Sequence, residues 1–124
     1  MEQGILKVAK NIVKVALVQM TMSTDQKANL QKAISKIKEA KLKGADIVCL
    51  PELFNSRYFP QSESDENFSL AQTIPGPVTN EIAKASKENK IVVIAGSIFE
   101  KDKEVFYNTS VVFNNGVMLG KYRK

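Results

Sequence analysis

Short apolar runs alternate with amphipathic stretches along the chain, and this alternation predicts most of its secondary structure. Residues 12–20 are largely apolar and rich in β-branched side chains, which indicates a buried strand. Ser23 and Gln26 fit a capping box at the start of a helix, and Gly44 fits a left-handed cap at its end. Between them, apolar residues recur at the spacing of one helix face: Leu30, Ala33, Ile34, Ile37 and Ala40.

A second short apolar run, residues 46–50, ends at Pro51 and predicts another strand. A strand, a helix and a strand in this order form a βαβ unit, whose right-handed crossover predicts that the two strands are parallel. Because both runs are apolar at successive positions, they suit a sheet that is covered on both faces.

The segment that follows, residues 55–73, shows no regular period and is expected to be a long loop. Loops of this length inside a compact domain are often functional, and this one carries an acidic cluster of Glu63, Asp65 and Glu66. Pro75-Gly76-Pro77 then predicts the start of a second helix, which should end near Asn89. Its inward residues are expected to be Val78, Ile82, Ala83 and either Ala85 or Ser86.

Three further strands are expected to complete the chain, the first over residues 91–99. Residues 105–113 and 117–122 flank Asn115-Gly116, a pair that favours a type I′ turn, so they predict a β-hairpin. The predicted order is therefore β-α-β-loop-α-β-β-β, an α/β fold with a mixed sheet. The last strand runs into Lys124 with no covering element after it, which is unexpected for a complete domain.

The composition is that of one folded domain. The chain has 124 residues, of which 44% are hydrophobic and 25% charged. No apolar stretch approaches the roughly 20 residues that a membrane-spanning helix needs, so we expect no membrane partner. The single cysteine, Cys49, excludes a disulfide within the chain and fits a reducing compartment, so we expect a cytoplasmic protein.

Histidine is absent, which removes several classes of chemistry. Neither a Ser-His-Asp nor a Cys-His set can be built, and one cysteine cannot supply a thiolate zinc site. Acid–base chemistry would have to use a carboxylate or a lysine. The net charge is +5, but only two of the 18 basic residues are arginine, which favours a solvated lysine surface over nucleic-acid binding.

Glu52 is the first candidate for chemistry, because it directly follows the predicted strand at residues 46–50. Ligands in open α/β sheets bind beyond the carboxyl ends of the strands, and flanking Leu53 and Phe54 would desolvate the carboxylate. An exposed loop glutamate is the alternative that its position alone favours. Cys49 is interpreted as a small buried thiol, because its odd separation from Glu52 sends the two side chains to opposite faces of an extended chain.

Several short motifs, each weak alone, together resemble the nitrilase (carbon–nitrogen hydrolase) superfamily over residues 13–124. In chain order they are Val15-Ala16-Leu17-Val18-Gln19-Met20, Gly44-Ala45-Asp46-Ile47-Val48, Leu50-Pro51-Glu52-Leu53-Phe54, Ile74-Pro75-Gly76-Pro77, Ala95-Gly96-Ser97, Tyr107-Asn108-Thr109-Ser110 and Gly120-Lys121-Tyr122-Arg123-Lys124. Within the superfamily, residues 54–61 with Tyr58-Phe59 look most like N-carbamoylputrescine amidases.

The resemblance implies the amino-terminal half of a four-layer α-β-β-α sandwich, a mixed sheet with helices on one face. Residues 1–124 are therefore expected to be one partial domain, with residues 1–11 as an extension. It implies that Glu52 is a general base and that Lys124 stabilises an oxyanion, with Tyr58 contacting substrate. The family's nucleophilic cysteine would lie beyond this chain, and no metal or organic cofactor is expected.

The expected partners are a small amide or carbamoyl substrate and either further copies of the chain or a missing carboxyl-terminal half. Half of a sandwich would leave one apolar sheet face bare, which favours association. The competing hypothesis is a non-catalytic α/β binding or regulatory module that keeps the fold. A cysteine encoded some tens of residues past Lys124 would favour the enzyme, and its absence would favour the module.

Overall fold

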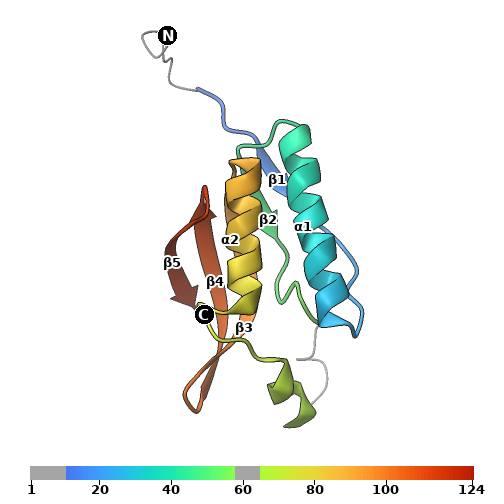
Figure 1. Cartoon of the computed structure of the whole chain (residues 1–124), viewed down its shortest axis with the longest axis vertical. Helices are drawn as coiled ribbons and strands as arrows, with labels where there is room; N and C mark the ends of the chain where they lie inside the picture. The colour runs from blue at the N-terminus through green and yellow to red at the C-terminus, as the bar shows by residue number, and fades with distance from the viewer. Residues whose placement is uncertain (1–10, 58–64) are drawn as a thin grey trace.

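The computed structural model describes residues 11–57 and 65–124, which form a five-stranded sheet and two α-helices (Figure 1). In chain order the elements are β1 (Val15–Leu17), α1 (Gln26–Leu42), β2 (Ile47–Leu50), the 3₁₀ helix η3 (Asp65–Leu70), α2 (Pro77–Asn89), β3 (Val92–Asp102), β4 (Val105–Asn114) and β5 (Val117–Arg123). The predicted α/β order is therefore confirmed, except that the segment expected to be a long loop contains η3.

The sheet is mixed, with the strands in the order β1-β2-β3-β4-β5. β1, β2 and β3 are mutually parallel, as the βαβ pattern predicts, while β4 is antiparallel to both β3 and β5. It follows that β5 runs in the same direction as β2 and β3. The carboxyl ends of β2, β3 and β5 thus lie at the same end of the sheet, which we call its carboxyl edge.

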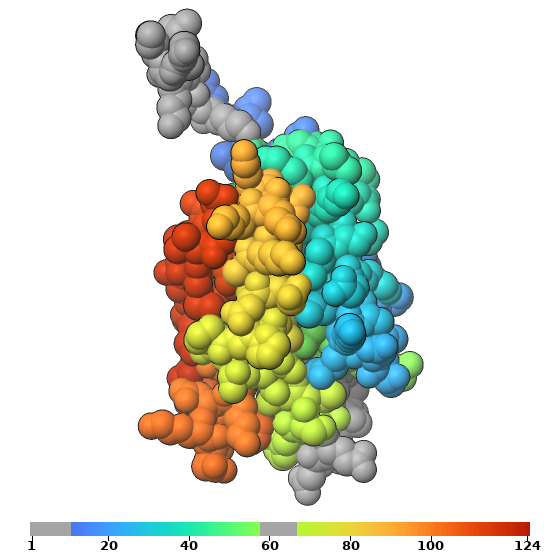
Figure 2. Space-filling view, viewed as in Figure 1, coloured from blue at the N-terminus to red at the C-terminus, as the bar shows by residue number. Residues whose placement is uncertain are grey.

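Both helices cover the same face of the sheet, and the space-filling view shows them side by side over it (Figure 2). One continuous core lies between the helices and the strands, because the apolar stripe of each helix faces the sheet. Its fully buried side chains include Ala33 and Ile37 of α1, Ile82 of α2, and Val48, Val93, Ala95, Val111 and Phe113 of the strands.

The opposite face, which we call the open face, carries Val15, Leu17, Ile47, Cys49, Val92, Ile94 and Val112. No described element covers this part of the face: Val15 and Leu17 are exposed, and Cys49 is half-buried. Farther along the same face, Phe68 of η3 packs against Phe99 and Phe106. Among the described residues the helices thus cover one face of the sheet, as the family resemblance implies, and not both faces, as the apolar strands alone suggest. The expectation of a buried Cys49 is also wrong. Two apolar faces are encoded, but the two helices pack on only one of them.

The first predicted strand is longer than the observed one. Residues 12–20 were expected to pair, yet β1 spans only Val15–Leu17. β1 lies at the edge of the sheet and its partner β2 has four residues, so there is no ladder for a longer strand to join.

The N-cap of helix α1 lies two residues later than the capping-box pattern predicts. The side chain of Asp25, not Ser23, accepts hydrogen bonds from the backbone N–H groups of Lys27 and Ala28, at 3.0 and 3.2 Å. Ser23 is held elsewhere, because its own N–H donates to Asn29 Oδ1 at 2.8 Å. At the far end Gly44 has φ +86°, as expected for a left-handed cap.

The β4–β5 hairpin is confirmed in detail. Asn115 and Gly116 both have positive φ, 50° and 87°, as a type I′ turn requires. Gly116 is also tightly fitted, because a Cβ atom there would lie 2.8 Å from Lys87 Cβ. A second hairpin joins β3 to β4, because β3 extends three residues past the predicted end at Phe99.

Within residues 11–57 and 65–124, the helices are too short or too polar to cross a bilayer.

Candidate functional site

The turn that carries Glu52 is fastened to an irregularity in β3. The β3–β4 register shifts between Ala95 and Ile98, which frees Ser97 from the regular ladder. Ser97 N–H donates to Pro51 O at 3.1 Å, and its carbonyl accepts from Phe54 N–H at 3.2 Å. Its hydroxyl accepts from Leu53 N–H at 3.3 Å. These three hydrogen bonds anchor the turn that follows β2 on β3, the strand that lies between β2 and β4.

Leu53, next to Glu52, adopts a backbone conformation that L-residues avoid. Its φ is +51°, and such strain costs on the order of 1–2 kcal/mol for a residue with a Cβ. Burial compensates for this cost, because the side chains of Leu53 and Phe54 both enter the core. The same turn directs Glu52 outward, so its side chain is 44% exposed. The expectation that Leu53 and Phe54 desolvate Glu52 is therefore wrong in the described structure.

Glu52 and Lys124 meet, although they lie far apart in the sequence. Lys124 Nζ is 3.7 Å from Glu52 Oε1. The backbone brings them together, because both residues follow strands whose carboxyl ends share one edge of the sheet. Lys124 extends the β4–β5 ladder by one more bond, from its N–H to Asn108 O at 2.9 Å. Lys124 is thus a paired residue, although it is the last residue of the chain. Tyr58, the third expected site residue, lies outside the described residues.

Asn108 of β4 joins this pair. Its side-chain Nδ2 donates to Glu52 Oε1 at 2.8 Å, and its backbone carbonyl holds Lys124. In the sequence, Asn108 stands out only as part of a motif and has no predicted role. Its place beside Glu52 and Lys124 could be recognised only once the β4–β5 register was known.

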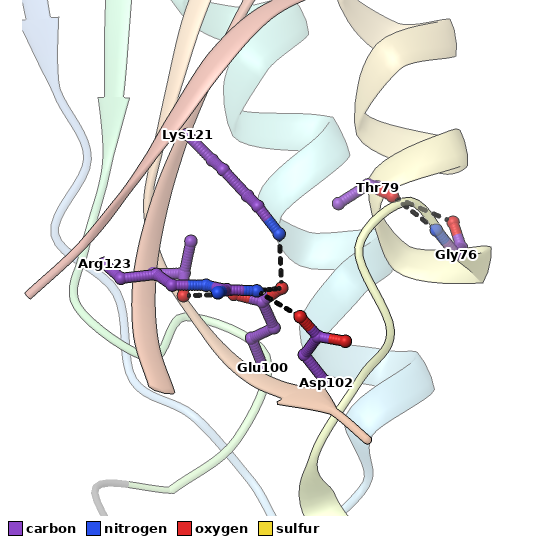
Figure 3. Close-up of polar contacts among 7 residues, drawn as sticks. Gly76, Thr79, Glu100, Asp102, Lys121 and Arg123 are labelled. Carbon is purple, nitrogen blue, oxygen red and sulfur yellow. Dashed lines mark hydrogen bonds and ion pairs between the residues drawn. The ribbon is translucent and has the colours of Figure 1, made fainter. Parts of the chain in front are cut away.

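A buried carboxylate, Glu100 of β3, holds the middle of β4 and the carboxyl end of β5 on the helix-covered side (Figure 3). Arg123 binds it with two hydrogen bonds of 2.9 Å, from Nε to Oε1 and from Nη2 to Oε2. Lys121 Nζ and Thr109 Oγ1 donate to it at 2.5 and 2.7 Å. Arg123 also reaches Asp102 at 2.9 Å and lies 3.9 Å from the centre of the Tyr107 ring.

These contacts change the ionisation of both main partners. Burial alone raises the pKa of Glu100, but the hydrogen bonds that it accepts, that from Arg123 first, outweigh burial and lower the pKa from 4.5 to about 2. Hydrogen bonds to Glu100 and then to Asp102 raise the pKa of the Arg123 guanidinium above its usual value. Glu100 and Arg123 are therefore both ionised across the ordinary pH range.

The anchor explains which way the neighbouring residues point. Thr109 and Arg123 are register partners whose side chains bind Glu100 on the helix-covered side. Successive strand residues alternate between faces, so Asn108 and Lys124 are directed to the other side, where Glu52 lies. The Glu52–Lys124 pair thus depends on the register that Glu100 stabilises.

Cys49 is three residues before Glu52, and both lie on the open-face side of the sheet. The expectation that their side chains point to opposite faces is therefore wrong, because the chain turns after β2 and is not extended there. In the part of the chain that the structure describes, no side-chain hydrogen bond joins its thiol to Glu52 or Lys124. The interpretation that Cys49 is not the nucleophile of this pair stays a prediction. The same residues contain no cluster of three or more metal-binding side chains.

An α/β layer that presents a carboxylate and an ammonium group at the carboxyl edge of its sheet fits the resemblance drawn from the sequence. The chain belongs to the carbon-nitrogen hydrolase family, whose model matches residues 14–124. Omega-amidase NIT2 of Homo sapiens is 41% identical over 116 residues, which cover 90% of this chain and 39% of that protein. A protein named Nitrilase from Pyrococcus abyssi is 40% identical over 115 residues, which cover 91% of this chain and 43% of that protein.

Solved structures agree with this assignment. The carbon-nitrogen hydrolase from Helicobacter pylori G27 has a TM-score of 0.83 at 28% identity, covering 90% of this chain and 39% of that one. Saccharomyces cerevisiae Nit3, described as a member of branch 10 of the nitrilase superfamily, has a TM-score of 0.76 at 35% identity, covering 90% and 44%. The chain thus spans about two fifths of the length of its relatives. These relatives lend no support to the finer resemblance to N-carbamoylputrescine amidases.

Proposed function

We propose that this chain forms part of an amidase-type carbon–nitrogen hydrolase that acts on small non-peptide amides. Glu52 is the general base, Lys124 stabilises the oxyanion, and a cysteine from outside residues 1–124 is the nucleophile. The observation that carries this proposal is the 3.7 Å approach of Lys124 Nζ to Glu52 Oε1 at the carboxyl edge of the sheet. The reaction requires neither histidine nor a metal, which suits a chain without histidine.

In the proposed reaction, Glu52 takes the proton of the cysteine thiol, and the thiolate adds to the amide carbonyl carbon. The Lys124 ammonium stabilises the charge on the carbonyl oxygen of the tetrahedral intermediate. The carbon–nitrogen bond then breaks, and Glu52 returns the proton to the leaving ammonia or amine. Water, deprotonated by Glu52, adds to the thioester; the carbon–sulfur bond breaks, and the proton passes back to the thiolate.

The substrate class rests on the relatives. Several curated relatives are named omega-amidases, and the human protein is 41% identical to this chain, so we favour an amide over an N-carbamoyl amine. The carbamoyl interpretation depends on residues 54–61, of which Tyr58 and the three residues after it lie outside the described structure. Tyr58 remains a proposed substrate contact.

We further propose that the open face is covered in the working protein, by the remaining part of the domain or by another copy of the chain. Covering this face would also remove water from around Glu52, whose carboxylate is exposed in this structure. We propose a cytoplasmic location, on the evidence of the single unpaired cysteine.

The first test is the sequence beyond codon 124, followed by an ammonia-release assay of the encoded protein on a panel of small amides and N-carbamoyl amines. A downstream cysteine and turnover of amides support the proposal. A gene without such a cysteine, together with no turnover, would replace it by the binding or regulatory module.

The 124-residue chain by itself should release no ammonia from these substrates. Its one thiol, Cys49, has no side-chain hydrogen bond to Glu52 or Lys124 among the described residues, so no activated nucleophile is at hand. The assay compares the chain with its Glu52→Ala and Cys49→Ser variants. Release that exceeds both variants would contradict the prediction and make Cys49 the nucleophile.

The isolated chain should also self-associate and bind a dye that reports apolar surface. Val15 and Leu17 on the open face are 50% and 80% exposed, on an edge strand. Light scattering and dye fluorescence of Leu17→Glu should show less association than the parent chain. Leu42→Glu is the matched control, because Leu42 is 78% exposed but lies at the end of α1. A dye-silent monomer in the parent chain would refute the prediction.

A further inference from the structure

Asn108 makes two different bonds to the residues assigned to the proposed reaction. Its side-chain Nδ2 donates to Glu52 Oε1 at 2.8 Å, and its backbone carbonyl accepts from Lys124 N–H at 2.9 Å. One residue therefore links the turn after β2 to the end of β5. These two segments are separated in the sheet by β3 and β4.

The side chain of Asn108 is held in a restricted environment. Its register partner on β3 is Phe99, which is buried, and cross-strand partners share a face of the sheet. Its neighbour Thr109 is fixed to Glu100 on the opposite face. Its Oδ1 is buried and accepts no hydrogen bond from the described residues. A buried, unpaired acceptor is unfavourable in a folded protein, so the Asn108 side chain is held at a cost to stability.

The two contacts made by the Glu52 side chain fall on the same oxygen. Asn108 Nδ2 and Lys124 Nζ both approach Oε1, at 2.8 and 3.7 Å. A carboxylate held through one oxygen offers the lone pairs of the other, Oε2, for proton transfer. The geometry thus divides the carboxylate into an anchored oxygen and an available one.

We propose that Asn108 is a positioning residue that holds Glu52 through Oε1, so that Oε2 faces the reacting thiol as the proton-accepting atom. Through its backbone carbonyl, Asn108 also fixes the separation between Glu52 and Lys124. This inference rests on the proposed function and adds a residue to it. Asn108 itself touches neither substrate nor the reacting atoms in this scheme.

The test uses the complete protein expressed from its full gene. Asn108→Ala should lower kcat about 100-fold, the scale of a misplaced catalytic group, with KM within about threefold of the parent value. Asn108→Asp keeps the shape but replaces the donor by a second carboxylate, and should lower kcat at least as much. Asn114→Ala removes another asparagine from the far end of β4 and should leave both constants unchanged.

A double variant separates positioning from a general structural effect. In a Glu52→Gln background, Asn108→Ala should cause little further loss of kcat, because it acts through Glu52. A full further loss would overturn the proposal, as would a normal kcat in Asn108→Ala alongside an inactive Glu52→Gln. Normal turnover of Glu52→Gln itself would instead overturn the proposed function.

A spectroscopic measurement covers the case in which the Asn108 variants do not fold or the protein shows no turnover. In protein labelled with ¹⁵N-asparagine, Glu52→Gln should move the side-chain amide resonance of Asn108 and leave that of Asn114 in place. An Asn108 resonance that does not respond would refute the contact on which the inference depends.

Discussion

Glu52→Gln in the complete protein should lower kcat by roughly 10²–10⁴-fold, the loss typical of removing a general base, while KM and the fold stay near those of the parent. Glutamine keeps the volume of the side chain, and its amide oxygen can still accept the hydrogen bond from Asn108 Nδ2. What it loses is the ability to take a proton. Ammonia release on the best small amide measures kcat and KM.

Glu81→Gln is the matched control, because Glu81 is an exposed carboxylate on α2 and has no part in the proposed site. It should leave turnover unchanged.

Lys124→Ala should also reduce turnover. The loss of turnover in Lys124→Ala should not add to the loss in Glu52→Gln, because both residues serve the same intermediates. Near-parent turnover in Glu52→Gln would show that Glu52 is not the general base and would contradict the proposed reaction.

Much of the fold follows from local sequence pattern, and the exceptions depend on tertiary pairing. The hairpin at Asn115-Gly116 and the cap at Gly44 are set by conformations that few residues adopt, so they could be predicted directly. The length of β1 could not, because it depends on how many residues β2 offers for pairing. The extension of β3 past Phe99 could not be predicted, because residues 100–104 are all charged. One of them, Glu100, is buried because partners distant in the sequence bind its carboxylate.

The site divides in a similar way. Glu52 could be placed at the carboxyl end of a strand, but its general-base role came from the family resemblance, and position alone favoured an exposed loop residue. The exposure is correct for the described chain, and the approach of Lys124 could not be derived from spacing. The roles of Ser97 and Asn108 could not be predicted from the sequence. They arise from an irregularity in β3 and from the register of β4 with β5, and neither feature leaves a local sequence signal.

Glu100→Gln should lower the free energy of unfolding by about 3 kcal/mol at neutral pH, the lower end of the cost of removing one partner from a buried ion pair. The lower end applies because the cationic partners Lys121 and Arg123 are about one third exposed and can be hydrated when the carboxylate is lost. Urea unfolding of the complete protein measures the difference. Glu104→Gln, an exposed glutamate in the β3–β4 connection, is the control and should change little.

The pH dependence of this difference identifies the carboxylate as its source. The pKa of Glu100 is about 2 in the folded chain, against 4.5 for an ordinary glutamate, so the unfolded chain binds more protons between these values. The stabilisation is therefore complete above about pH 4.5 and is lost as the pH falls through about 2. The gap in stability between the parent protein and Glu100→Gln should narrow over that interval and stay constant above it. A gap that does not change with pH would mean that Glu100 stabilises the strand ends by packing and not by its charge.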